Sequence, residues 1–205
     1  MGTVVTEGKL AMTSALSPRD AGFEAAFVKH YPRVFGILLR LVGDRGQAEE
    51  LASEVFLKLY RQPWLADLGG LDAPEALARD LSAQAGLSGW LYRTATHVGI
   101  DHLRAAARRQ HYEHAAARAG TRSAEDGDPL QEVLREEQRR CVRAVLAKLP
   151  PTRAQILVLR AMGLSYYELA EILGAKRGSV GTMLARAEAD FHKRFLKMFG
   201  KEKPL

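Results

Sequence analysis

Apolar side chains recur at intervals of three and four residues along most of this sequence, and two-residue alternation is almost absent. The first spacing places apolar residues on one face of an α-helix, whereas alternation would indicate a half-buried strand. The stretch from Gln47 to Arg61 is the clearest example, because Leu51, Val55 and Leu59 share one helical face. The pattern predicts an all-α fold.

Capping signals divide the first half of the chain into helices. Ser17, followed by proline and three positions later by aspartate, predicts a helix start, and Gly43 predicts its end. We expect this helix to kink or break at Pro32. Asp44 can cap the next helix, and Ser88 predicts the start of a long, increasingly basic helix.

The second half begins after a stretch, AARAGTRSAEDGD, that contains no large apolar residue and therefore reads as a linker. A helix restarts at Asp128-Pro129, and shorter ones follow over 152–162, 165–173 and 177–199. The residues expected to face inward on the restarted helix are Leu130, Val133, Leu134, Cys141, Val142, Val145 and Leu149. We predict two small helical domains, 17–115 and 128–200, with a disordered N-terminus at 1–16 and a flexible linker at 116–127.

The chain carries a net charge of +6 and has a pI near 9.6, which favours a polyanionic partner such as nucleic acid. Cys141 is the only cysteine, so an intramolecular disulfide and a cysteine zinc site are excluded. The first residues lack a basic segment followed by an apolar one, and no apolar run is long enough to span a bilayer. We expect a cytoplasmic protein that has no metal or other cofactor and does not act at a membrane.

The sharpest local motif is GLSYYELAEILGAKRGSVGTMLARAEADF. A capping box at Ser165, a glycine turn at Gly174 and a longer second helix are typical of a helix-turn-helix, whose second helix enters the major groove. Side chains suited to bases and phosphates follow the turn: Lys176, Arg177, Ser179, Thr182 and Arg186. The alternative is an ordinary helical hairpin with a solvated charged face.

A second motif combines aromatic and basic side chains in the first half of the chain. Its members are Trp90, Arg93, His97, Arg104, Arg108 and Arg109. Rings can stack on unpaired bases while cations follow the backbone, so the motif suits the handling of a single DNA strand. The alternative for Trp90 alone is an ordinary core position.

These motifs together resemble the extracytoplasmic-function sigma factors. LVGDRGQAEELASEVFLKLYR and GWLYRTATHVGIDHLRAAARR resemble their second conserved region, and the helix-turn-helix stretch resembles their fourth. The resemblance implies a non-enzymatic factor that binds core RNA polymerase, recognises the −10 and −35 promoter elements and promotes strand opening in the bacterial cytoplasm, at the nucleoid when active.

The resemblance also implies residue roles. The helix at 177 onward would read the −35 element as duplex, and the segment around Trp90 would read the −10 element as a partly single strand. The expected contacts to core polymerase are Glu50, Ser53, Glu54 and Leu57. An anti-sigma factor is a further expected partner.

Several positions depart from the family pattern. His97 stands where asparagine is usual, Gly181 and Met183 replace frequent cations, and Glu188 replaces an arginine. The stretch over 62–88 is longer than usual for the family. It could tune promoter opening, since it adjoins the expected strand-reading segment, or be an inert insertion, which we favour.

Two other functions would account for part of the sequence. A stand-alone helix-turn-helix regulator would leave the polymerase-docking resemblance unexplained. A histidine site would have to use His111 and His114, and no nucleophile, base and orienting group accompany them.

Overall fold

The computed structural model describes residues 17–65, 81–113 and 129–200, and these are helical apart from short turns. The predicted all-α class is confirmed. The helices, in chain order, are α1 (Pro18–Val42), α2 (Arg45–Tyr60), α5 (Leu81–Glu113), α6 (Pro129–Lys148), α7 (Pro151–Ala161), α8 (Tyr166–Leu173) and α9 (Arg177–Phe199). The predicted N-terminal segment 1–16, the linker at 116–127 and most of the longer 62–88 stretch lie outside the described residues.

The predicted caps of the first two helices are present. The Ser17 hydroxyl accepts a hydrogen bond from the backbone N–H of Asp20, and the Asp44 carboxylate accepts one from Gln47 at 2.8 Å. Gly43 ends α1 in the left-handed conformation with φ 79°. A Cβ at this glycine would lie 2.5 Å from the Arg143 guanidinium, so conformation and space both favour glycine.

Two helix boundaries differ from the prediction. α1 does not break at Pro32 but continues through it, and Val28, whose carbonyl loses its donor to that proline, is 71% exposed. Water can hydrate a carbonyl on this outer face, so the helix need not break there. α5 begins at Leu81 rather than at Ser88, since the residues before Ser88 include good helix formers and the helix needs no cap at that position.

Helices α1, α2 and α5 form the first group and pack through a shared apolar core. Its fully buried side chains include Ile37, Leu38, Phe56, Leu59 and Leu91. α1 packs closely on α5 at Gly99, where a Cβ would lie 2.5 Å from a methyl group of Leu41. The packing therefore favours a glycine in the middle of this helix.

Helices α6 to α9 form the second group, in which α9 lies against α6, α7 and α8. Val145 of α6 and Leu149, which directly follows that helix, are buried as predicted. The prediction is wrong for Val133, Leu134 and Val142, which are 53%, 49% and 40% exposed.

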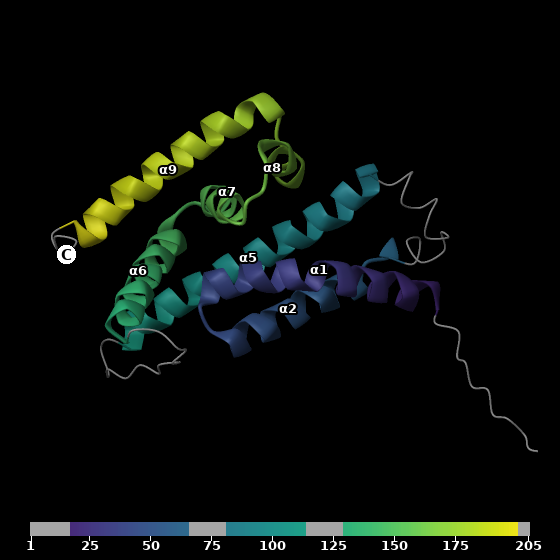
Figure 1. Ribbon diagram of the computed structural model, residues 1–205, viewed down its shortest axis with the longest axis horizontal. Coiled ribbons are helices and arrows are strands. Elements are labelled where there is room, and N and C mark those ends of the chain that lie inside the picture. The colour runs from purple at the N-terminus through teal and green to yellow at the C-terminus, as the bar shows by residue number, and fades with distance from the viewer. Residues whose placement is uncertain (1–16, 66–80, 114–128, 201–205) are drawn as a thin grey trace, which may run out of the picture.

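The two groups lie side by side, with α7 and α8 along α5 (Figure 1). Their buried apolar side chains belong to one contiguous cluster, which runs from α1 to α9. A buried polar contact crosses the boundary: the Gln155 amide of α7 donates to the Thr96 hydroxyl of α5 at 2.8 Å. The second group is thus packed on the helix that carries the aromatic and basic motif.

Candidate nucleic-acid interface

The helix-turn-helix consists of α8, a turn at Gly174 and α9. Ser165 and Glu168 form a reciprocal capping box at the start of α8, and the Ser165 backbone bond holds the pKa of Glu168 below its ordinary value. Gly174 has φ 64°, and the N–H of Ala175 donates to the carbonyl of Ala170 at 2.8 Å. These local bonds set the direction in which α9 leaves the turn.

All five residues predicted to contact duplex DNA are exposed at the leading half of α9. They are Lys176, which is the N-cap residue, and Arg177, Ser179, Thr182 and Arg186. The buried face of the same helix consists of Val180, Leu184 and Ala187. Because the two sets occupy different faces, the polar set is free to enter a groove while the apolar set holds the helix on the core.

Sequence reasoning missed Tyr167. This side chain stands in the first turn of α8, is 47% exposed, and has the Arg177 guanidinium 3.9 Å above its ring centroid. A hydrogen bond to Glu171 raises the pKa of the Tyr167 phenol above its ordinary value. The sequence contains a signal for this residue, because two consecutive tyrosines, Tyr166 and Tyr167, follow the capping serine. Two neighbouring residues of a helix point in different directions, so the burial of one face does not require both of them to be aromatic.

The residues predicted to read the −10 strand divide into two sets. His97, Arg108 and Arg109 are exposed on α5. Trp90 is half-buried, packs against the core and meets Trp64 edge to face with ring centroids 5.9 Å apart. Trp90 therefore combines a core contact with partial access to solvent.

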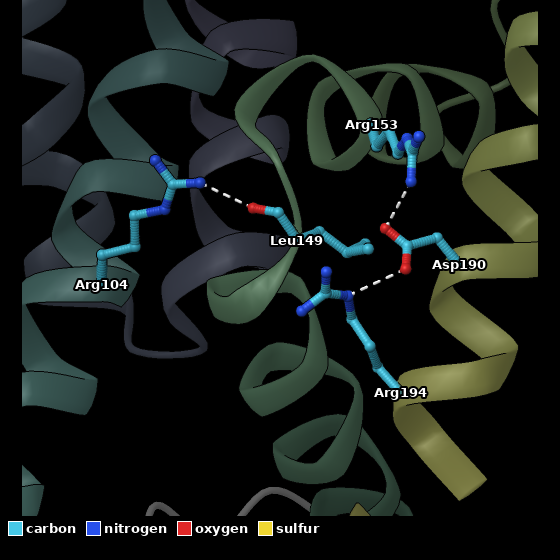
Figure 2. A network of polar contacts seen from close by, with 5 residues as sticks. All are labelled: Arg104, Leu149, Arg153, Asp190 and Arg194. Atoms are coloured by element: carbon cyan, nitrogen blue, oxygen red, sulfur yellow. Dashed lines mark hydrogen bonds and ion pairs between the residues drawn. The ribbon is translucent and has the colours of Figure 1, made fainter. Parts of the chain in front are cut away.

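Arg93, which is also exposed, and the half-buried Arg104 are hydrogen-bonded to the second group. Arg93 Nε donates to the carbonyl of Ile172, in the last turn of α8, at 2.7 Å. Arg104 Nη2 donates to the carbonyl of Leu149 at 2.6 Å, as Figure 2 shows. Carbonyls at the end of a helix carry partial negative charge and favour a cation. The sequence could not predict this use, because it depends on where α6 and α8 lie.

Figure 2 also shows how α7 is joined to α9. The Asp190 carboxylate accepts hydrogen bonds from Arg153 at 2.7 Å and from Arg194 at 3.0 Å. The bond from Arg153 is the main cause that holds the pKa of Asp190 below its ordinary value. The bond from Arg153 links α7 to α9, whereas the bond from Arg194 lies within α9.

The residues predicted to bind core polymerase form one exposed face of α2. Glu50, Ser53, Glu54 and Leu57 are all exposed, and Leu57 is 49% exposed despite its apolar side chain. Glu54 forms an ion pair with Lys58 at 2.7 Å. The face is thus acidic and polar around one accessible leucine.

The positions that depart from the family pattern differ in accessibility. His97 and Glu188 are exposed, whereas Gly181 and Met183 are half-buried. A Cβ at Gly181 would lie 3.8 Å from the Tyr166 ring, and Met183 packs against the core.

A groove of about 960 Å³ lies where α1, α6, α7 and α9 meet. Its apolar lining residues include Leu39, Val142, Leu157 and Phe191. Arg40, Arg135, Arg139, Arg143 and Glu136 also line it. The groove therefore combines apolar side chains with a charged set that is positive on balance.

The histidine alternative has no support among the described residues. No three His, Cys, Asp or Glu side chains gather there as metal ligands. His102 Nε2 lies 3.1 Å from the side-chain oxygen of Gln47, while the side chains of His111 and His114 lie outside the described part of the chain. Across the described ranges, no helix is long and apolar enough to cross a membrane.

Two segments of the chain match protein-family models in the same order as the two helix groups. Residues 26–64 match sigma-70 region 2, and residues 139–190 match sigma-70 region 4. The chain is 28% identical over 172 residues to the RNA polymerase sigma-H factor of Pseudomonas aeruginosa, which covers 80% of this chain and 81% of that protein. It is also 28% identical over 167 residues to the probable ECF RNA polymerase sigma factor SigI of Mycobacterium tuberculosis, where the match covers 80% of this chain and 52% of the relative.

The chain belongs to the extracytoplasmic-function group of the sigma-70 family. As a sigma factor, it is an alternative factor that directs RNA polymerase to specific promoters in transcription initiation. A solved structure, the sigma factor RpoE in complex with the anti-sigma factor NepR from Bartonella quintana, is similar at a TM-score of 0.44 with 17% identity, covering 85% of this chain and 96% of that one.

Proposed function

We propose that this sigma factor recognises a two-part promoter, with α9 reading the −35 element as duplex and the exposed part of α5 holding the −10 strand during opening. The observation that carries the proposal is the exposed polar face at the leading half of α9, on a helix whose other face is buried. Arginine can bond two acceptors on a guanine edge, and small hydroxyl side chains reach bases or phosphates.

The −10 part of the proposal rests on α5. His97, Arg108 and Arg109 are exposed there, and the half-buried Trp90 offers an aromatic surface held by Trp64. A base that leaves the duplex can stack on such a ring while cations hold the strand. Arg93 and Arg104 can join this set only after they leave the carbonyls of Ile172 and Leu149. The proposed mechanism therefore includes separation of α8 from α5.

The contact with core polymerase is assigned to α2. Its exposed face offers Glu50, Ser53, Glu54 and Leu57. An accessible leucine ringed by polar side chains fits an interface with an apolar centre and a polar rim. Both promoter contacts are then tethered to one platform, and their combined affinity exceeds that of either alone. The polymerase supplies the catalysis, and we place this action in the cytoplasm, at the nucleoid.

The test is transcription by core bacterial RNA polymerase on a library of randomised promoters, with and without this chain. We expect transcripts that depend on the chain and start downstream of a shared two-part motif. If the chain binds DNA in a gel shift and yields no such transcripts, the proposal is wrong and a stand-alone helix-turn-helix regulator is favoured.

We further propose that the groove between α1, α6, α7 and α9 receives an amphipathic helix of an anti-sigma factor. The apolar lining residues, such as Val142 and Phe191, suit the apolar face of a helix. The arginines that line the same groove suit acidic residues beside that face. Such a helix would hold the two groups together and keep Arg93 and Arg104 on the second group.

The groove is tested with Val142→Glu, which places a carboxylate among its apolar lining residues. The control is Val133→Glu, at an exposed valine of the same helix that does not line the groove. A protein captured from the host by the wild-type chain should inhibit transcription that depends on that chain. It should inhibit the Val133→Glu chain equally and the Val142→Glu chain much less. Equal inhibition of all three chains would place the partner elsewhere.

A further inference from the structure

The contact between Tyr167 and Arg177 joins the two helices of the helix-turn-helix at the point where α9 begins. The guanidinium lies 3.9 Å from the ring centroid, which is the shortest cation–ring contact among the described residues. Both side chains are exposed, so neither is held there by a surrounding core. The ring is itself oriented, since the capping box at Ser165 fixes the first turn of α8 and Glu171 binds the phenol one turn later.

A free arginine side chain at the tip of a helix samples many rotamers, and it loses that freedom when it grips a base. A guanidinium that already lies on a ring has lost part of this freedom before DNA arrives. The ring covers one face of the guanidinium. A partner can therefore approach the guanidinium only from its opposite face or from the edge that points away from the ring. A directed arginine suits two bonds to one guanine edge better than it suits a loose contact with any nearby phosphate.

We propose that Tyr167 is a positioning residue for Arg177: it aims the guanidinium into the major groove and sharpens the choice of one base pair of the −35 element. This inference rests on the proposed role of α9. Tyr167 itself need not touch a base, and its effect should pass through Arg177.

The two tyrosines of α8 provide a matched control. Tyr166 is as exposed as Tyr167, at 47%, and faces a different arginine, Arg160, at 5.4 Å from its ring centroid. Replacing either by leucine removes one exposed aromatic ring from the same turn. Tyr167→Phe keeps the ring over which Arg177 lies and removes the hydroxyl, which hydrogen-bonds to Glu171 and, more weakly, to Arg177. It therefore tests whether the ring alone is enough to position Arg177.

The experiment uses holoenzyme, formed by the full chain and core polymerase, and selects duplexes whose −35 region is randomised. For wild type we expect one base pair whose preference Arg177→Gln abolishes. Tyr167→Leu should reduce the preference at that base pair by about two- to fivefold, the range of an exposed cation–ring contact. Tyr166→Leu and Tyr167→Phe should leave it close to wild type. Thermal unfolding of each variant checks that the fold is intact.

Two further readouts separate positioning from a general effect. In the Arg177→Gln background, Tyr167→Leu should change nothing, since the residue it positions is gone. The salt dependence of binding should be the same for Tyr167→Leu and wild type, because no phosphate contact is lost.

The inference is overturned if Tyr167→Leu leaves the preference intact, if it weakens all base pairs alike, or if its effect persists without Arg177. A wild-type holoenzyme that shows no −35 preference at all would overturn the proposed function of α9 together with this inference. The wild-type result thus distinguishes the two failures.

Discussion

His30 is a buried titratable side chain that packs against α5. It is 5% exposed, and its Nδ1 lies 3.4 Å from the hydroxyl of Tyr92. Burial is the main cause that lowers its pKa from 6.5 to about 4, with a smaller contribution from Lys29. The folded state therefore holds a neutral imidazole at a pH where the unfolded chain already binds a proton.

Stability should fall as acid is added through this window. Above about pH 6.5 both states are neutral at His30, and between there and about pH 4 the unfolded state binds more protons, so the free energy of unfolding decreases as pH falls. Relative to His30→Gln, wild type should lose an additional ~2 kcal/mol between about pH 7 and about pH 4.5. Urea unfolding at both values measures it. An equal loss in both chains would show that His30 titrates normally.

At the scale of the element, the capping box gives α8 its start. The Ser165 hydroxyl accepts from the N–H of Glu168, and a Glu168 oxygen accepts from the N–H of Ser165 at 2.7 Å. α8 spans only Tyr166–Leu173, so these two hydrogen bonds are a large fraction of all the hydrogen bonds that hold the helix.

Ser165→Ala should destabilise the chain by about 1 kcal/mol, the usual effect of losing such a cap. Ser165→Asp retains an acceptor and should recover most of the loss. Thermal or urea unfolding of the three chains gives the comparison. If alanine were as stable as serine, the bonds at this cap would contribute nothing in solution.

The exposed face of α2 carries a prediction about assembly. Leu57→Asp should weaken binding to core polymerase by at least about tenfold, since it puts a charge at the apolar centre of the proposed interface. Val28→Asp is the matched control, an exposed apolar residue of α1 that is 71% exposed. Fluorescence titration of labelled chain with core polymerase reads both affinities. Stability should be unchanged in both variants, because neither side chain is buried. If Val28→Asp lowered the affinity for core polymerase as much as Leu57→Asp does, α2 would not be the specific polymerase contact.

For the molecule as a whole, the contact between the two helix groups contains one buried pair of polar side chains. Thr96 is fully buried and Gln155 is 4% exposed, and the amide of the second donates to the hydroxyl of the first at 2.8 Å. Removing one partner of a buried hydrogen bond leaves the other unsatisfied, whereas removing both can be nearly neutral.

Thr96→Val should therefore destabilise the chain by about 1–3 kcal/mol, and the double variant Thr96→Val with Gln155→Leu should recover a substantial part of it. Free energies of unfolding from urea titration close the cycle. If the stability losses of Thr96→Val and Gln155→Leu simply added in the double variant, the two side chains would not interact, and the two helix groups would not pack through this pair in solution.

Much of the fold could be predicted locally. Periodicity indicated helices, and the short range of capping bonds explains why the predicted limits of α8 and α9 agree with the structure to within a residue. The errors at Pro32 and Ser88 arose where a local signal was outweighed, in the first by a solvent-facing carbonyl and in the second by helix formers upstream. The exposed set on α9 followed from the same periodicity.

By itself, then, the sequence determined the all-α class, the order of the two sigma regions and the side chains that α9 presents, because each depends on residues a few positions apart. Only the tertiary structure decided that Arg93 and Arg104 bind carbonyls of the second group, that Tyr167 meets Arg177, and that Val133 and Leu134 are left uncovered. These outcomes depend on which helix lies beside which, and a periodic pattern states which face is apolar without stating what will cover it.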